Sequence, residues 1–271
     1  MPFKVRLKIA AIVLSVAVSL GALAAWSWPL AIVAGILGLI YLEMIWPRLH
    51  LFYGSAIQNV RDQGDDVVAL TFDDGPSLWT DPILDSLKKH QVRATFFLLG
   101  KNVERHPEIA RRIQEEGHVI GYHSYSHARL HRKGPSFIRE DLNQCVNAFT
   151  AAGISAEPLI RFPHGVKNWF AIADIKRRGW TLAAWGRGVW DSKRPGVEII
   201  VERAKKLKAG EILLLHDGNG IQENPDRSQT AEAVERILSE QKRKWVTLHP
   251  SKDRRDRSAD SEILRAREAR S

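Results

Sequence analysis

Residues 67–77 read VVALTFDDGPS, and this stretch decides the fold. It opens with an apolar run rich in β-branched residues, which predicts a buried β-strand. The run is followed at once by Asp-Asp-Gly-Pro at 73–76, residue types that are typical of turns. Two neighbouring carboxylates therefore stand where a buried strand ends, which is the edge at which α/β folds place their chemistry. Because the chain turns here, both can face one pocket. A turn without function is the alternative interpretation.

The chain has 271 residues and a formal net charge of +9. This length is enough for one sizeable α/β domain with a real core. The basic residues are spread along the chain and form no patch interleaved with aromatic residues. We therefore expect attraction to anionic membranes or cell-wall polymers and no nucleic-acid partner. Cys145 is the only cysteine, which excludes an intrachain disulfide and a cysteine–histidine zinc module.

Residues 9–46 are almost wholly apolar, and about 20 such residues cross a bilayer as one helix. We predict a membrane anchor of one or two spans within residues 1–50 and a location at the cell membrane. Lys4, Arg6 and Lys8 precede the anchor and indicate a cytoplasmic N-terminus. A cleaved signal peptide is the alternative, but apolar sequence continues where polar sequence should follow a cleavage site. The membrane face of the remaining chain stays open.

A linker at 51–66 leads into residues 67–250, where apolar strands alternate with amphipathic helices. After the first strand, we expect strands at 92–99, 118–122, 159–162, 181–185, 211–215 and 245–248. Helices are expected at 81–90, 107–117, 135–152, 169–179, 197–207 and 230–238. This alternation predicts a mainly parallel sheet with helices outside. The sequence lacks the Gly-rich dinucleotide loop of an open doubly wound sheet, so we expect the sheet to close like a barrel. Residues 251–271, dense in both charge signs, read as a charged, solvated tail.

His123 and His127 follow the third predicted strand in the segment His-Ser-Tyr-Ser-His. Four residues apart, they would lie on one face of a helical turn, with both imidazoles directed at one divalent ion. Alone this pattern is weak, because two polar loop residues need no common role. Together with one carboxylate from 73–74, it becomes the two-histidine, one-carboxylate set of a catalytic zinc site. The other carboxylate could then accept a proton from water activated by the ion.

His216 follows the apolar run Leu213–Leu215 and precedes Asp217. The intrinsic pKa of histidine suits proton donation to a leaving group. A histidine that merely satisfies its own hydrogen bonds at the sheet edge is the alternative. Its position at a strand end, next to an acid, favours the functional interpretation.

Five segments resemble, in order, the motifs of the polysaccharide deacetylase family, the NodB-homology domain of carbohydrate esterase family 4. They are Thr71–Gly75, His123–His127, Arg161–Pro163, Trp185–Asp191 and Leu214–Asp217. The resemblance covers about residues 67–250, which it identifies as the catalytic domain. It implies a distorted (β/α) barrel. It also implies metal-dependent removal of N-acetyl, sometimes O-acetyl, groups from polymers such as chitin, peptidoglycan or xylan.

The resemblance also assigns the catalytic residues. Asp73 would be the general base and His216 the general acid. One divalent ion would be bound by Asp74, His123 and His127; zinc is the usual metal, with Co²⁺ or Mn²⁺ as alternatives.

Further residues receive supporting roles from the same resemblance. Arg161 would hold the base in place, and Asp191 would orient the acid histidine. The substrate pocket would be formed by Pro163, His164, Trp185 and Leu214, with the backbone N–H of His164 binding the oxyanion.

The motifs depart from the family pattern at several positions. Gly188 and Ser192 stand where Asp and Trp are frequent, and Tyr122 where Asn is common. The third motif usually has an aromatic or Pro-aromatic pair after Arg, and here it reads Arg-Phe-Pro-His-Gly. These departures leave the expected metal ligands and proton carriers intact, so they bear on substrate binding.

The leading hypothesis is a membrane-anchored, zinc-dependent hydrolase that removes N-acetyl groups from amino sugars of a cell-envelope polysaccharide or chitooligosaccharide. A deacylase of a lipid-linked amino sugar is the first alternative, favoured by the apolar N-terminus and the altered pocket motifs. A non-catalytic, membrane-tethered glycan-binding protein is the second. Asp73 and His216 argue against the second, because a binding protein has no need of both.

Overall fold

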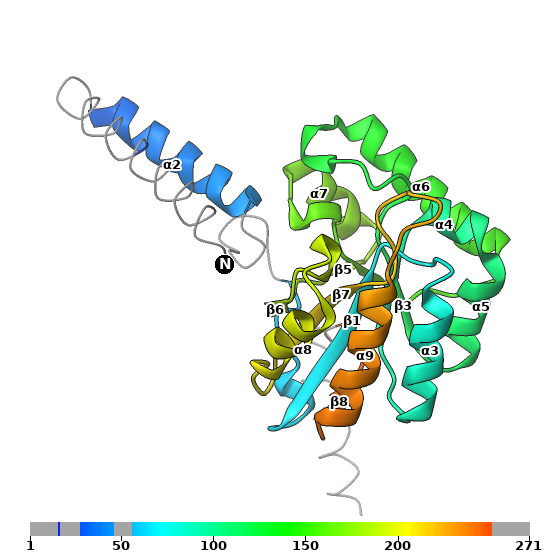
Figure 1. Cartoon of the computed structure of the whole chain (residues 1–271). Helices are drawn as coiled ribbons and strands as arrows, with labels where there is room; N and C mark the ends of the chain where they lie inside the picture. The colour runs from blue at the N-terminus through cyan, green and yellow to red at the C-terminus, as the bar shows by residue number, and fades with distance from the viewer. Residues whose placement is uncertain (1–15, 17–27, 46–55, 251–271) are drawn as a thin grey trace, which may run out of the picture.

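A computed structural model describes residues 16, 28–45 and 56–250 (Figure 1). Most of the predicted anchor at 1–50, the first part of the linker and the charged tail at 251–271 lie outside the described residues. Helix α2 (Trp28–Ile45) covers the second half of the predicted anchor. No helix among the residues described combines the length and apolar character needed to cross a bilayer.

The sheet is built around β1 (Val67–Asp73), whose seven residues are all buried. In order across the sheet the strands are β5-β4-β3-β2-β1-β7-β6, and β8 (Lys244–Val246) pairs with the first half of β1. The remaining strands are β2 (Thr95–Leu98), β3 (Val119–Tyr122), β4 (Leu159–Ile160), β5 (Thr181–Leu182), β6 (Arg187–Gly188) and β7 (Ile212–His216). All of these pairings are parallel, as predicted. The continuous apolar run of β1 reflects its cover on both faces.

The sheet curls without closing. Its end strands, β5 and β6, do not pair with each other in the described part of the chain. Ile57 from the linker instead lies beside the end of β5, where its N–H donates to Leu182 O at 2.8 Å and its carbonyl accepts from Ala184 N at 2.8 Å. The architecture is therefore a curled half-barrel, more open than the predicted closure.

Helices cover the outside of the sheet (Figure 1). They are α3 (Thr80–Lys89), α4 (Gly100–Arg105), α5 (Pro107–Glu115), α6 (Pro135–Ala151), α7 (Trp169–Arg177), α8 (Val197–Lys205) and α9 (Ser228–Glu240). Their apolar faces form the core with the strands, in which the rings of Phe72 and Phe96 stack at 4.9 Å. The helices and strands expected from the sequence all occur with small shifts at their ends. Helix α4 and strand β6 were not expected, because each is short and no turn separates α4 from β2.

Gly100 allows α4 to approach α6 closely. A Cβ at this position would lie 2.8 Å from Cys145 Cα and 2.7 Å from Tyr125 Cδ2. Gly100→Ala should therefore lower the free energy of unfolding by about 1–3 kcal/mol through overpacking. Gly134→Ala is the matched control, because nothing lies within 4 Å of a Cβ there. Urea denaturation measures both, and equal stability of the two variants would refute the close approach.

Candidate active site

The carboxyl ends of β1, β3 and β7 meet at one edge of the sheet and open into a cleft of about 490 Å³. Most of the residues singled out from the sequence line it: Asp73, Asp74, His123, His127, His164, Trp185, Leu214 and His216. Arg161, Pro163 and Asp191 are buried behind its wall. The sequence therefore predicted the residues of one cleft from segments spread over more than half of the chain.

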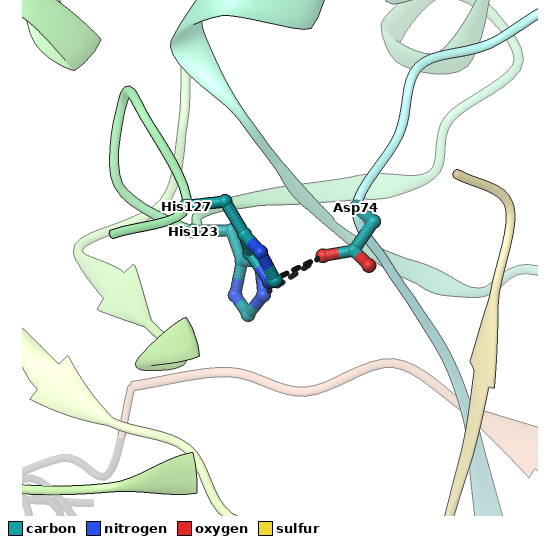
Figure 2. A group of neighbouring side chains, drawn as sticks. All are labelled: Asp74, His123 and His127. Atoms are coloured by element: carbon teal, nitrogen blue, oxygen red, sulfur yellow. Dashed lines mark ion pairs between the residues drawn. The ribbon is translucent and has the colours of Figure 1, made fainter. Parts of the chain in front are cut away.

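Three of these side chains converge on one point, as Figure 2 shows. Asp74 Oδ1 lies 3.3 Å from His123 Nε2 and 3.0 Å from His127 Nε2. One ligand atom from each residue lies within 4.8 Å of the other two. Asp74 Oδ1 is buried, and no residue in the described ranges donates to it a hydrogen bond of good geometry. A buried carboxylate oxygen facing two imidazole nitrogens is a donor set that fits a divalent cation such as zinc.

The backbone and neighbouring side chains hold these ligands in place. Asp74 adopts a φ of 74°, which turns its side chain to the same cleft as Asp73. Its Oδ2 accepts from Gly220 N at 2.9 Å, and its carbonyl accepts from Asn102 Nδ2 at 2.8 Å. His123 Nδ1–H donates to the Arg161 carbonyl at 2.7 Å, so Nε2 is left to face the other ligands.

The sequence did not predict that Asn102 and Gly220 belong to the site. Asn102 lies in the unexpected helix α4, and its Nδ2 donates to both the Asp74 and Gly220 carbonyls. Gly220 lies in the loop after β7. No local pattern connects either residue to the first motif, because the contacts join segments 28 to 146 residues apart.

The expected helical turn at 123–127 is wrong. The segment is an irregular loop in which Ser124 and His127 have φ values of 74° and 56°. The buried carboxylate of Asp141 on α6 accepts from the backbone N–H groups of Tyr125 at 3.0 Å and Ser126 at 3.1 Å. These hydrogen bonds take the place of the backbone hydrogen bonds of a helix. The two imidazoles converge because of the path of the loop, without a helical turn.

The electrostatics of Asp74 suit a metal ligand. Burial favours its neutral form, but the His123 and His127 imidazoles outweigh burial and hold the pKa of Asp74 well below its usual range. The carboxylate is therefore ionised at neutral pH.

Asp73 lies beside a buried arginine. Arg161 Nη1 donates to Asp73 Oδ1 at 2.7 Å and to Thr71 Oγ1 at 2.9 Å, while Nη2 donates to the Ala184 carbonyl. Burial lowers the pKa of Arg161, and the charge of Asp73 opposes that shift. Arg161 is fully buried, so this pair fixes the position of the Asp73 carboxylate.

His216 ends β7, beside Asp73 at the end of the neighbouring strand β1, and is paired with Asp191. His216 Nδ1–H donates to Asp191 Oδ1 at 2.9 Å, and the His216 backbone N–H donates to Oδ2 at 2.8 Å. Thr230, which sequence analysis missed, donates to the same Oδ2 at 3.0 Å. Burial disfavours the imidazolium, but Asp191, with smaller contributions from Asp74 and Asp73, raises the pKa of His216 to about 9. His216 is therefore protonated at neutral pH.

His164 and Trp190 complete the cleft wall. Both have φ values of 61°, in the left-handed region that non-glycine residues rarely occupy. The His164 ring lies 4.6 Å from that of His127, and burial with nearby positive charge lowers the pKa of His164 to about 4. Trp190 is 45% exposed and offers an apolar surface on which a sugar ring can pack. Unusual backbone conformations of this kind concentrate at functional sites.

Asp217 packs against Gly75 in the Asp-Asp-Gly loop. It is fully buried, accepts from Thr80 Oγ1 at 2.6 Å, and burial raises its pKa to about 7. A Cβ on Gly75 would lie 2.0 Å from Asp217 Oδ2, so glycine is required at that position.

Comparison with known proteins agrees with this geometry. Residues 60–183 match the family model described as polysaccharide deacetylase. A peptidoglycan-N-acetylglucosamine deacetylase of Bacillus cereus is 34% identical over 191 residues, 68% of this chain and 87% of the relative. A chitooligosaccharide deacetylase of Bradyrhizobium sp. is 33% identical over 69% of this chain and 90% of the relative.

Solved structures show the same likeness. The crystal structure of a peptidoglycan N-acetylglucosamine deacetylase superimposes with a TM-score of 0.64 and 31% identity, covering 71% of this chain and 90% of that one. The fold, the motifs and these matches show that the chain belongs to the polysaccharide deacetylase family, and the two curated relatives named above are hydrolases of carbon–nitrogen bonds.

Proposed function

We propose that the protein removes N-acetyl groups from amino sugars of a cell-envelope polysaccharide or chitooligosaccharide, using one divalent ion, zinc in the first instance. The observation that carries this proposal is the placement of Asp73 and His216 in one cleft with Asp74, His123 and His127. The names of the relatives, which act on peptidoglycan and chitooligosaccharide, support the substrate class.

The ion would be held by Asp74, His123 and His127, where it supplies Lewis acidity that polarises a carbonyl and makes water more acidic. Asp73, fixed by Arg161, takes a proton from the attacking water. His216, whose Nδ1 is bound to Asp191, gives the proton on Nε2 to the leaving amine nitrogen. The backbone N–H of His164 stabilises the developing oxyanion.

A second candidate is the deacylation of a lipid-linked amino sugar at a membrane. Glu43, near the end of α2, is fully buried, and its charge acts on Lys167, which is 2% exposed. Burial lowers the pKa of Lys167 to about 8 against the effect of Glu43. Lys167 lies in the same loop as His164, so α2 meets the domain close to the cleft.

The exposed surface of α2 supports membrane attachment. Its exposed large side chains are all apolar: Trp28, Leu30, Ile32, Val33, Ile36, Leu37, Leu39 and Tyr41. We propose that the N-terminal segment holds the protein at the cell membrane, with the cleft near the lipid surface.

Asp73→Asn tests the general base. The variant should keep the metal content of the wild type, because Asp73 is not one of the three converging ligands, and acetate release from chitooligosaccharides should fall by about 10²–10⁴-fold in kcat. Asp85→Asn, an exposed carboxylate 71% accessible at its side chain, is the control. Undiminished acetate release by Asp73→Asn would exclude Asp73 as the base.

The pH profile tests His216 as the acid. An acid must begin protonated, so kcat/KM should fall as pH rises through the pKa of His216, at about 9. Asp191→Asn removes the main charge that raises this pKa while burial remains, so the basic limb should move down by more than about one pH unit. Thr230→Val removes only a neutral donor to Asp191 and should leave the limb in place. An unmoved limb in Asp191→Asn would contradict the assignment.

Substrate form separates the two candidates. Full-length protein is assayed on N-acetylglucosamine presented either as soluble oligomers or on a lipid in vesicles. A higher kcat/KM on the lipid-linked form supports the second candidate, and equal or lower values support the first. Protease accessibility of the catalytic domain in intact and opened cells then identifies the membrane face.

A further inference from the structure

Two cations line the cleft without a counter-ion. Arg129 and Lys193 are both exposed cleft residues. No carboxylate in the described part of the chain lies within ion-pair distance of either. Nearby basic residues behave differently, since Arg194 pairs with Asp226 and Arg187 with Glu211.

The two cations line the same cleft as the candidate catalytic residues but come from different segments. Arg129 comes two residues after His127, in the loop that follows β3. Lys193 ends the short helix η4 (Asp191–Lys193), which begins with the partner of His216. A sugar bound in this cleft would therefore share it with both cations.

The acids of the cleft are already engaged. Asp73 is paired with Arg161, and Asp74 faces the two imidazoles. Gly188 and Ser192, which also line the cleft, carry no charge. Arg129 and Lys193 therefore add positive charge to the cleft that no acid among the described residues balances.

Such an arrangement favours an anionic ligand. Guanidinium groups bind carboxylate or phosphate through paired hydrogen bonds, and charge-assisted bonds are about twice as strong as neutral ones. Walls of low dielectric constant concentrate the field of the two cations inside the cleft. An uncharged glycan would leave both cations without a partner other than water.

We propose that Arg129 and Lys193 bind an anionic group, a carboxylate or a phosphate, that the substrate carries beside its N-acetylated amino sugar. The inference rests on the proposed deacetylase function and narrows its substrate class. Arg129 and Lys193 are then specificity residues that contact the substrate outside the reacting amide.

Matched substrates test this inference. Acetate release is measured on N-acetylglucosamine oligomers, on oligomers bearing a lactyl carboxylate, and on oligomers bearing a phosphate monoester. The wild type should show a kcat/KM at least about tenfold higher on one of the anionic series than on the neutral one, a difference of about 1.4 kcal/mol. The anionic series that is preferred identifies the source of the charge.

The double variant Arg129→Gln/Lys193→Gln should lose this preference and keep kcat/KM on the neutral series within about twofold. Lys88→Gln/Arg93→Gln removes the same charge from exposed positions outside the cleft and should retain the preference. Added salt should reduce the preference, because dissolved ions screen exposed charges, with a Debye length of about 10 Å at 0.1 M. Equal rates on all series in the wild type, or equal losses on all series in the variant, would overturn the inference and leave the deacetylase function standing.

A binding measurement separates failure of the inference from failure of the proposed function. Calorimetry with Asp73→Asn compares uncleaved neutral and anionic sugars without requiring turnover. The inference is supported if Asp73→Asn binds an anionic sugar more tightly than the neutral one and if the triple variant with Arg129→Gln and Lys193→Gln loses this difference. This holds even if no acetate is released. Equal affinities for both sugars contradict it.

Discussion

The site depends on one constraint: a buried carboxylate oxygen, Asp74 Oδ1, faces two imidazole nitrogens, and no described residue donates to it a hydrogen bond of good geometry. A buried polar atom left in this state is costly unless something binds it. The rest of the structure supports that arrangement. Gly220 and Asn102 orient Asp74, the Arg161 carbonyl orients His123, and Asp141 shapes the loop that carries His127. A divalent ion would satisfy all three ligands at once.

Arg161 connects Asp73 with His123. Its side chain donates to Asp73 and its carbonyl accepts from His123, so one buried residue positions both side chains. His216 is held by Asp191 and, through Asp191, by Thr230. Asp73, the candidate base, and His216, the candidate acid, therefore have separate supports.

The sequence predicted the parts of this structure that have a local signal. The buried run of β1 and the amphipathic spacing of α5 predict their elements, and strand ends followed by polar residues predict the active edge. The histidines were found by spacing, but their loop is not helical, because Asp141 and two left-handed residues set its path. Asn102, Thr230 and Gly220 could not be found, since their roles arise only from contacts between distant segments. The pairing of Ile57 beside the end of β5 could not be predicted either, because it joins distant segments without a local sequence signal.

Gly188 and Ser192, two of the departures from the family motifs, line the cleft together with the exposed residues Arg129, Lys193 and Trp190. The other roles proposed for the cleft residues depend on the metal centre. X-ray absorption and anomalous diffraction on zinc-loaded protein test it most directly. The account predicts one zinc per chain, bonded to a carboxylate oxygen of Asp74 and to Nε2 of His123 and His127. Protein that takes up no metal from excess zinc, or binds it at other residues, would contradict it.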